Sequence, residues 1–108
     1  MTSPMTSAQL RTLSELGVST LESEVLAEKA ASLGHHGRMV EKTMAALNAF
    51  DPARGTAEDR KVLVRAAAQA VWKFFVQREL CGLRDQREVI RFYGIPQEVL
   101  NRLGAVER

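Results

Sequence analysis

Cysteine is nearly absent from this chain of 108 residues, which contains only Cys81. A single thiol cannot form an intrachain disulfide, so the sequence excludes the class of small secreted domains held together by disulfides and suits the reducing cytoplasm. An excess of charge of one sign is also missing, because fifteen basic and thirteen acidic residues give a net charge of only +2. No strong global field therefore argues for nucleic acid or a membrane surface as partner.

Long apolar runs are lacking too. None approaches the ~20 residues that a helix needs to cross a bilayer, so we expect no membrane partner. The opening residues, MTSPMTSAQLR, contain no basic stretch followed by an apolar run, so we expect no secretory signal peptide. The expected compartment is the cytoplasm.

Strand signals are the last notable absence. Apolar residues recur instead at steps of three and four, which is the period of helices. The hydrophobic fraction of 45% and the charged fraction of 26% are those of a globular chain, and the length suits one domain. We predict an all-α fold, with residues 1–7 as a flexible N-terminal tail and residues 8–108 as a single helical domain that begins with a marginal N-terminal helix.

The first long helix is expected over about residues 20–50. Ser19 can cap its start, and Glu22 follows at the spacing of a capping box. Further along, an apolar stripe keeps its phase straight through the Gly-His-His-Gly segment 34–37, so we expect the helix to continue across both glycines despite a cost of roughly 1 kcal/mol for each. The stripe consists of Leu26, Ala30, Leu33, Gly37, Val40, Met44 and Leu47.

The second long helix is expected over about residues 57–81. Thr56 and Asp59 have the spacing of a capping box at its start. Gly82 is suited to end it, with Leu83 as the apolar residue that follows such a stop. We predict that the two long helices pack as an antiparallel pair.

Two short helices are expected to cover one end of that pair, over about residues 86–93 and 96–103. Asp85 and Glu88 have capping-box spacing before the first of them, and Pro96 is suited to the first turn of the second.

The lengths and faces of the long helices predict a homodimer. The first helix would measure ~45 Å at 1.5 Å per residue, whereas a compact chain of this size is only ~34 Å across. The second helix is apolar around most of its circumference, including a third side with Val62, Val76 and Leu80. A helix of that kind is usually surrounded by protein. A two-fold dimer would cover both features.

The residues that could carry chemistry do not form a catalytic or metal-binding pattern. His35 and His36 are adjacent, so on a helix they point ~100° apart, whereas a metal-binding pair needs the i, i+4 spacing. Cys81 shares a helix face with Phe74, which favours a buried structural thiol over a nucleophile. We therefore expect no cofactor and no enzymatic activity.

Arg78 is the most informative charge, because it falls on the main apolar face of the second long helix. An unpaired buried guanidinium is costly, so we expect a carboxylate partner. The candidates are Glu79, Asp85, Glu88, Glu24 and Glu28. The polar cluster Gln77, Arg78, Glu79, Arg84 and Asp85 is interpreted as a structural ion-pair unit, with a ligand or enzyme site as the functional alternative.

Residues 86–103 offer a second functional alternative, because helix, glycine turn and helix match the outline of a helix-turn-helix motif. In that interpretation the contacts to nucleic acid would come from Arg87, Arg91, Gln97, Asn101 and Arg102. Ile90 weakens it, since that position usually carries a small residue. We expect nucleic acid to be the less favoured partner.

Three segments together resemble a family of small bacterial proteins known only as a domain of unknown function. They are WKFFVQRELCGLRD (72–85), YGIPQEVLNRLG (93–104) and LESEVLAEKAASLGHHGRMVEKTMAAL (21–47). The likeness covers about residues 20–104. It implies an all-helical cytoplasmic protein and supplies no activity, substrate or catalytic residue. It also implies that residues 77–79 and 82–85 belong to one structural unit. The leading interpretation is a non-enzymatic, homodimeric binding or structural module, for which another protein is a further possible partner.

Overall fold

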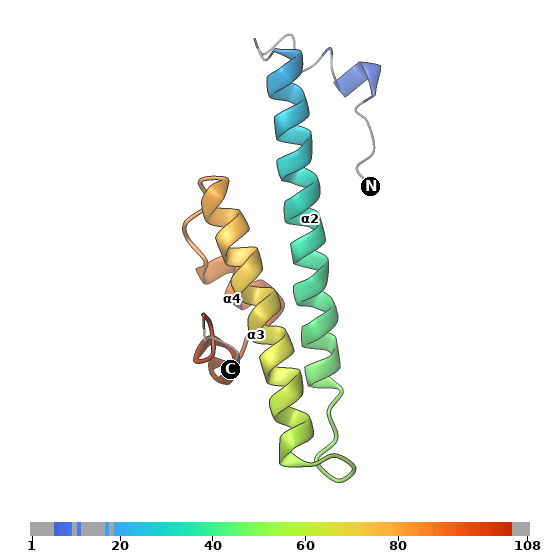
Figure 1. Ribbon diagram of the computed structural model, residues 1–108, viewed down its shortest axis with the longest axis vertical. Helices are drawn as coiled ribbons and strands as arrows, with labels where there is room; N and C mark the ends of the chain where they lie inside the picture. The colour runs from blue at the N-terminus through green and yellow to red at the C-terminus, as the bar shows by residue number, and fades with distance from the viewer. Residues whose placement is uncertain (1–5, 10, 12–16, 18, 105–108) are drawn as a thin grey trace. The chain divides into compact units, whose positions relative to one another are not determined.

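The computed structural model describes residues 6–9, 11, 17 and 19–104, and in this part of the chain the regular elements are helices without a strand (Figure 1). The all-α prediction is confirmed. Contacts divide the chain into two compact units, Met1–Gly34 and His35–Arg108. The expected tail over residues 1–7 and the marginal N-terminal helix lie mostly outside the described residues. The helices with described bounds are α2 (Thr20–Asn48), α3 (Ala57–Leu80), α4 (Arg87–Tyr93) and α5 (Gln97–Leu100).

Helix α2 begins and continues as its sequence predicts. The hydroxyl of Ser19 accepts the backbone N–H of Glu22 at 3.1 Å, which satisfies one of the free donors of the first turn. The helix then passes through Gly34 and Gly37 without interruption. The apolar stripe is buried only from Gly37 onward, at Val40, Met44 and Leu47, whereas Leu26 and Ala30 in the first unit are exposed.

Both ends of α3 are fixed by local hydrogen bonds that the sequence predicts. Thr56 and Asp59 form a complete capping box, because each side chain accepts the backbone N–H of the other. At the far end, Gly82 has a φ of 84°, and the N–H of Leu83 donates to the carbonyl of Arg78 at 2.8 Å. Together with the bond from Gly82 N–H to the carbonyl of Glu79 (2.9 Å), this is a Schellman motif, which turns the chain sharply away from the helix axis.

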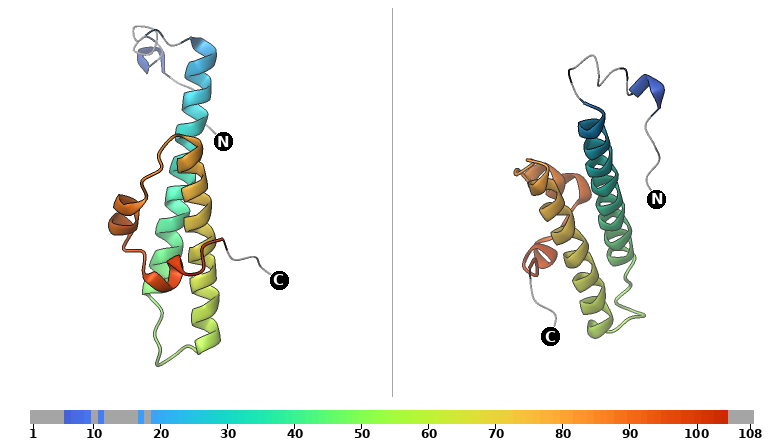
Figure 2. Two further views of the ribbon diagram at one scale, coloured as in Figure 1. Left: turned by 90° about the vertical axis from the view of Figure 1, so that its left-hand side faces the viewer. Right: turned by 45° about the horizontal axis from the view of Figure 1, so that its top comes forward.

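The core of the second unit lies where the C-terminal part of α2, helix α3 and the two short helices meet. Val40, Val71 and Val99 are fully buried there. Gly37 of α2 lies close to the ring of Phe74 on α3, so the two long helices pack together at this point (Figure 1). Helix α5 lies against α3 (Figure 2). This packing fixes where α4 and the turn before it are held.

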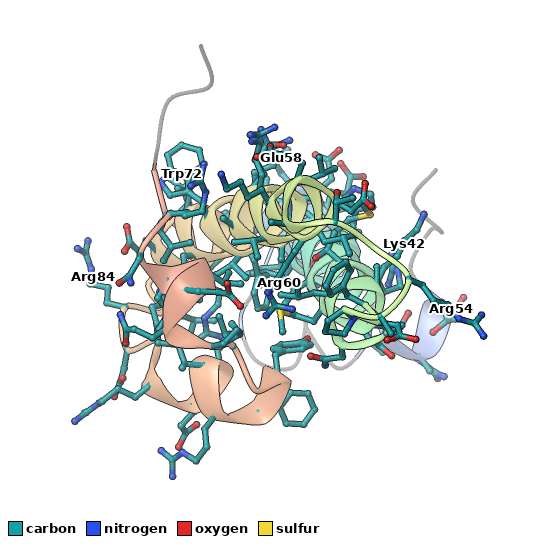
Figure 3. The ribbon with its side chains drawn as sticks, turned by 90° about the horizontal axis from the view of Figure 1, so that it is seen from below. Lys42, Arg54, Glu58, Arg60, Trp72 and Arg84 are labelled. Carbon is teal, nitrogen blue, oxygen red and sulfur yellow. The ribbon has the colours of Figure 1, made fainter. Side chains whose placement is uncertain are left out.

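The loop between α2 and α3 is closed by the ring of Phe50. A Cβ added to Gly55 would approach Cε1 of that ring to 2.5 Å, so the loop has no space for a side chain at this position. The guanidinium of Arg60 lies over the same ring, 5.6 Å from its centroid, and also pairs with Glu98 of α5. In Figure 3, Arg60 lies among the helices, whereas Arg84 points outward.

Helix α5 is shorter than the predicted 96–103. The helix ends at Leu100, and the N–H of its C-cap Asn101 makes the last α-helical bond, to the carbonyl of Gln97 at 2.8 Å. The N–H groups of Arg102 and Leu103 donate to carbonyls only three residues earlier. The chain therefore continues as tight turns to Gly104, whose φ is 72°.

Candidate functional site

The Schellman turn after α3 places Arg78 beside the loop that leads into α4. The Nε–H of Arg78 donates to Oε1 of Gln86 at 2.7 Å, and Nη2 donates to the main-chain carbonyl of Asp85 at 3.1 Å. The amide of Gln86 in turn donates to the carbonyl of Leu83 at 3.2 Å. Arg78 also stacks on the ring of Phe74, 5.8 Å from its centroid. The arginine therefore holds the loop to the helix that precedes it.

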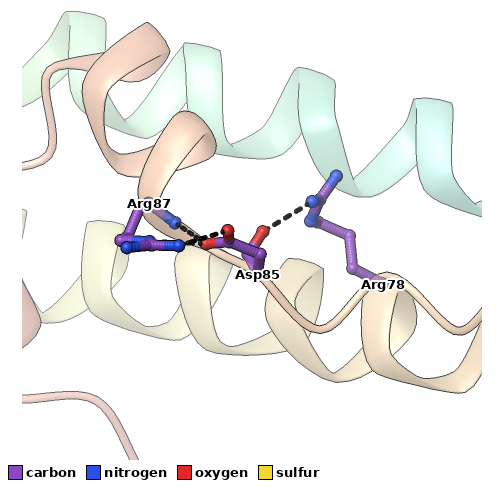
Figure 4. Close-up of polar contacts among 3 residues, drawn as sticks. All are labelled: Arg78, Asp85 and Arg87. Atoms are coloured by element: carbon purple, nitrogen blue, oxygen red, sulfur yellow. Dashed lines mark hydrogen bonds and ion pairs between the residues drawn. The ribbon is translucent and has the colours of Figure 1, made fainter.

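The prediction that a carboxylate pairs with Arg78 is wrong. Its hydrogen-bond partners are a side-chain amide and a carbonyl, and in the described part of the chain no carboxylate forms an ion pair with it. Arg78 is half-buried, so water screens its charge and a neutral partner is sufficient. Asp85 takes part through its backbone while its carboxylate faces the other way (Figure 4).

That carboxylate is held by Arg87. Its two oxygens accept Nε–H at 3.1 Å and Nη2–H at 2.9 Å, and Oδ1 also accepts the backbone N–H of Arg87 at 3.1 Å. The capping box predicted for Asp85 and Glu88 is therefore wrong, because Asp85 bonds two residues ahead in an Asx-type turn and Gln86 is the N-cap of α4.

The contacts from Arg87 lower the pKa of Asp85 from 3.8 to about 2. The side-chain hydrogen bonds are the largest cause, followed by the backbone bond. Because the pKa is lower in the folded state, the interaction stabilises the fold above pH 3.8 and is lost as the pH falls through about 2.

We expect Arg87→Ala to return the Asp85 titration toward 3.8, measured by following its carboxyl carbon by NMR. The control is Arg84→Ala, because Arg84 is exposed and makes no described bond to Asp85. An unchanged midpoint in Arg87→Ala would contradict this account of the turn.

Beside Arg78 lies an open pocket of about 540 Å³. The ring of Phe74 lines it and packs edge-to-face with Tyr93, with centroids 6.0 Å apart. Tyr93 also meets Phe92 edge-on at 4.9 Å. The lining consists of Phe74, Arg78, Glu88, Val89, Arg91, Phe92 and Tyr93. Aromatic faces and two guanidinium groups therefore share one concave surface.

The rest of the predicted polar cluster does not converge on Arg78. Glu79 and Arg84 are exposed, and Gln77 is half-buried. Within the described residues, no hydrogen bond or ion pair joins any of these three side chains to Arg78. Of the predicted cluster, Arg78 bonds directly to the backbone of Asp85. The prediction did not include Gln86, which bonds to Arg78 and to the carbonyl of Leu83.

The residues of the helix-turn-helix alternative are mostly engaged elsewhere. The amide of Gln97 donates to Asn101 at 2.8 Å, and Arg87 is bonded to Asp85. Arg91 and Arg102 are exposed. Helix α5 has only four residues and lies against α3, which is short for a helix that must enter a major groove. Nucleic-acid binding stays an untested prediction that this geometry does not favour.

The residues with metal-binding or nucleophilic chemistry do not gather in the described part of the chain, where no group of three or more His, Cys, Asp or Glu could hold a metal ion. His35 and His36 meet edge-on at 5.2 Å. Burial lowers the pKa of His36, and the charges of His35 and Lys73 lower it further. Cys81 is half-buried at the C-cap of α3.

Comparison with known proteins assigns the chain to a family but does not assign it an activity. Across the described helices, none is long and apolar enough to cross a membrane. No curated protein and no solved structure matches the chain. A family model matches residues 9–108, which confirms the resemblance to a family of unknown function inferred from segments 21–47, 72–85 and 93–104. The chain therefore belongs to the family of unknown function DUF6665.

Proposed function

We propose that the protein is a non-enzymatic homodimer in the bacterial cytoplasm that acts by binding a ligand or a protein partner. The bacterial source rests on the family resemblance, and the compartment rests on the single cysteine. The observation that carries the homodimer is a stripe of side chains on α3 that are exposed except for half-buried Val76.

That surface, called the outer stripe below, lies on the side of α3 away from its buried residues. Val62 and Leu80 are five turns apart and point the same way, about 180° from buried Val71. They remain 57% and 70% exposed, and Trp72 beside the stripe is 47% exposed. Large exposed apolar side chains that recur along one face are typical of an interaction surface. The outer stripe consists of Val62, Ala66, Gln69, Lys73, Val76 and Leu80.

The stripe is self-complementary in an antiparallel arrangement of two copies. Its members follow at steps of four, three, four, three and four, which read the same in both directions. Centred near Val71, two copies would place Val62 against Leu80 of the partner subunit. The same register places Gln69 against the partner's Lys73. A two-fold axis requires such reciprocal pairing.

One further feature agrees with the homodimer, and another supports an antiparallel arrangement of the two long helices within each chain. Leu21, Val25 and Leu26 on the first half of α2 are exposed, so that apolar surface is also available to a partner. Residues 49–56 form a short connection between α2 and α3, which favours an antiparallel pair of helices within each chain.

The test is molar mass in solution by light scattering. The wild-type chain is expected at twice 12.0 kDa. Val62→Glu should convert it to a monomer, because an unpaired charge buried in an interface costs several kcal/mol. Adding Leu80→Lys to Val62→Glu should restore the dimer, since the register brings the two new charges together across the axis. Phe92→Glu is the control, because Phe92 is exposed outside the stripe.

A monomeric wild type would refute the homodimer. A dimer that survives Val62→Glu would instead refute the outer stripe as its interface.

A further inference from the structure

The pocket at α4 combines an apolar surface with a small excess of positive charge. Its lining includes buried Phe74 and also Phe92, which is 82% exposed. The charged residues of the lining are Arg78, Arg91 and Glu88, so two positive groups face one negative group. A volume of about 540 Å³ is typical of pockets that hold small molecules, which are mostly apolar with a few oriented polar groups.

Arg78 lines the pocket and is held in place by the loop before α4. The bonds to Gln86 and to the carbonyl of Asp85 fix its Nε and Nη2, and its guanidinium carbon lies over the ring of Phe74, 5.8 Å from the centroid. A guanidinium has five N–H donors, and in the described part of the chain only these two bonds use them. Both acceptors are uncharged groups, so the positive charge of Arg78 is not neutralised by an ion pair.

These features select the ligand's chemistry. A planar carboxylate matches the fork of a fixed guanidinium and would supply the missing negative charge. A cation would meet two arginines, and a neutral apolar molecule would desolvate Arg78 without a partner. The exposed ring of Phe92 and the neighbouring ring of Tyr93 both line the pocket and offer contact to an apolar body.

We propose that this pocket binds a small aromatic carboxylate, with the carboxylate on Arg78 and the ring against Phe92 and Tyr93. The inference names a ligand class for the binding function proposed above and rests on that function. It does not require the dimer, because the pocket and the outer stripe share no residue.

The test uses two probes with the same ring, naphthalene-2-carboxylate and naphthalene-2-carboxamide, of which only the first carries a negative charge. Each is titrated into the full chain by calorimetry, with backbone amide shifts recorded by NMR. We expect the carboxylate to bind at least about tenfold more tightly than the carboxamide, with the largest shifts in α4 and at residues 83–86. Equal affinity for the two probes, or no binding by the carboxylate, would overturn the proposal.

Variants separate the two halves of the site. Arg78→Gln should remove the preference for the carboxylate, whereas Phe92→Ala should weaken both probes by about tenfold. Arg84→Gln, at an exposed position outside the pocket, should change neither affinity. If circular dichroism shows that Arg78→Gln is unfolded, the exposed Arg91→Gln takes its place, and a reduced preference is expected there as well.

These measurements test the proposed homodimer and the proposed ligand site independently of each other. Probe binding is repeated on Val62→Glu, which is expected to be monomeric. If the carboxylate binds and the wild type is a monomer, only the homodimer is wrong. If the wild type is a dimer and the probes do not bind, only the ligand site is wrong.

Discussion

Phe74→Ala is expected to destabilise the fold by about 3–5 kcal/mol, because it removes a ring that three helices share. The ring is 8% exposed, meets Tyr93 of α4 edge-on and lies 3.6 Å from where a Cβ on Gly37 of α2 would be. It also supports the guanidinium of Arg78. For a chain of this length, the loss corresponds to a melting temperature lower by roughly 15–30 °C. Thermal and urea unfolding followed by circular dichroism would measure it.

Phe92→Ala is the matched control for this prediction. It removes the same side chain from the next helix, but the ring is 82% exposed, so its removal leaves no buried cavity. Its expected effect is within about 0.5 kcal/mol. Equal losses in the two variants would contradict the placement of Phe74 at the centre of the fold.

The helix boundaries were largely predictable because the signals that set them are local. Thr56 and Asp59 close a capping box, and Gly82 ends α3 with its positive φ, each through bonds within a few residues. Such bonds depend on residue type and spacing alone. The continuity of α2 across Gly37 was predictable for the same reason, since the phase of the apolar stripe is a local property.

The partner of Arg78 was not predictable in the same way. Helical phase shows that a charge lies on an apolar face, and charge alone then suggests a carboxylate. The amide of Gln86 reaches Arg78 only because the turn at Gly82 reverses the chain, and the same turn directs the carboxylate of Asp85 toward Arg87. A neutral partner is sufficient for the Arg78 guanidinium only because the guanidinium is partly exposed to water. Its exposure depends on the tertiary fold, which the local sequence pattern does not show.

The pocket was missed because nothing in the sequence separates its residues from the core. Val89, Phe92 and Tyr93 are all apolar or aromatic positions of one short helix, yet Val89 is buried and Phe92 is exposed. The difference arises because α4 has only one packed side, which faces Phe74. In a helix of seven residues, the apolar pattern is too brief to show which side that is.

Gly37→Leu is the second substitution with a large expected effect, and we expect it to destabilise the fold by about 3 kcal/mol. A Cβ at this position would already lie 3.1 Å from Oη of Tyr93 and 3.6 Å from Cε1 of Phe74, so the rest of a leucine side chain has no space. Gly37→Ala is the control and should be close to neutral, because the helix gains about 1 kcal/mol while only the Tyr93 hydroxyl must shift. Urea unfolding of both variants measures the difference.

The double variant Gly37→Leu with Phe74→Ala tests the contact between the two long helices directly. If the leucine and the phenylalanine ring compete for one volume, removing the ring leaves room for the leucine, and the double variant should be about 1–2 kcal/mol more stable than the sum of the single losses predicts. Substitutions at separate sites would add within about 0.5 kcal/mol. Strict additivity would therefore show that Gly37 of α2 does not pack on Phe74 of α3, and the core described for residues 35–104 would have to be revised.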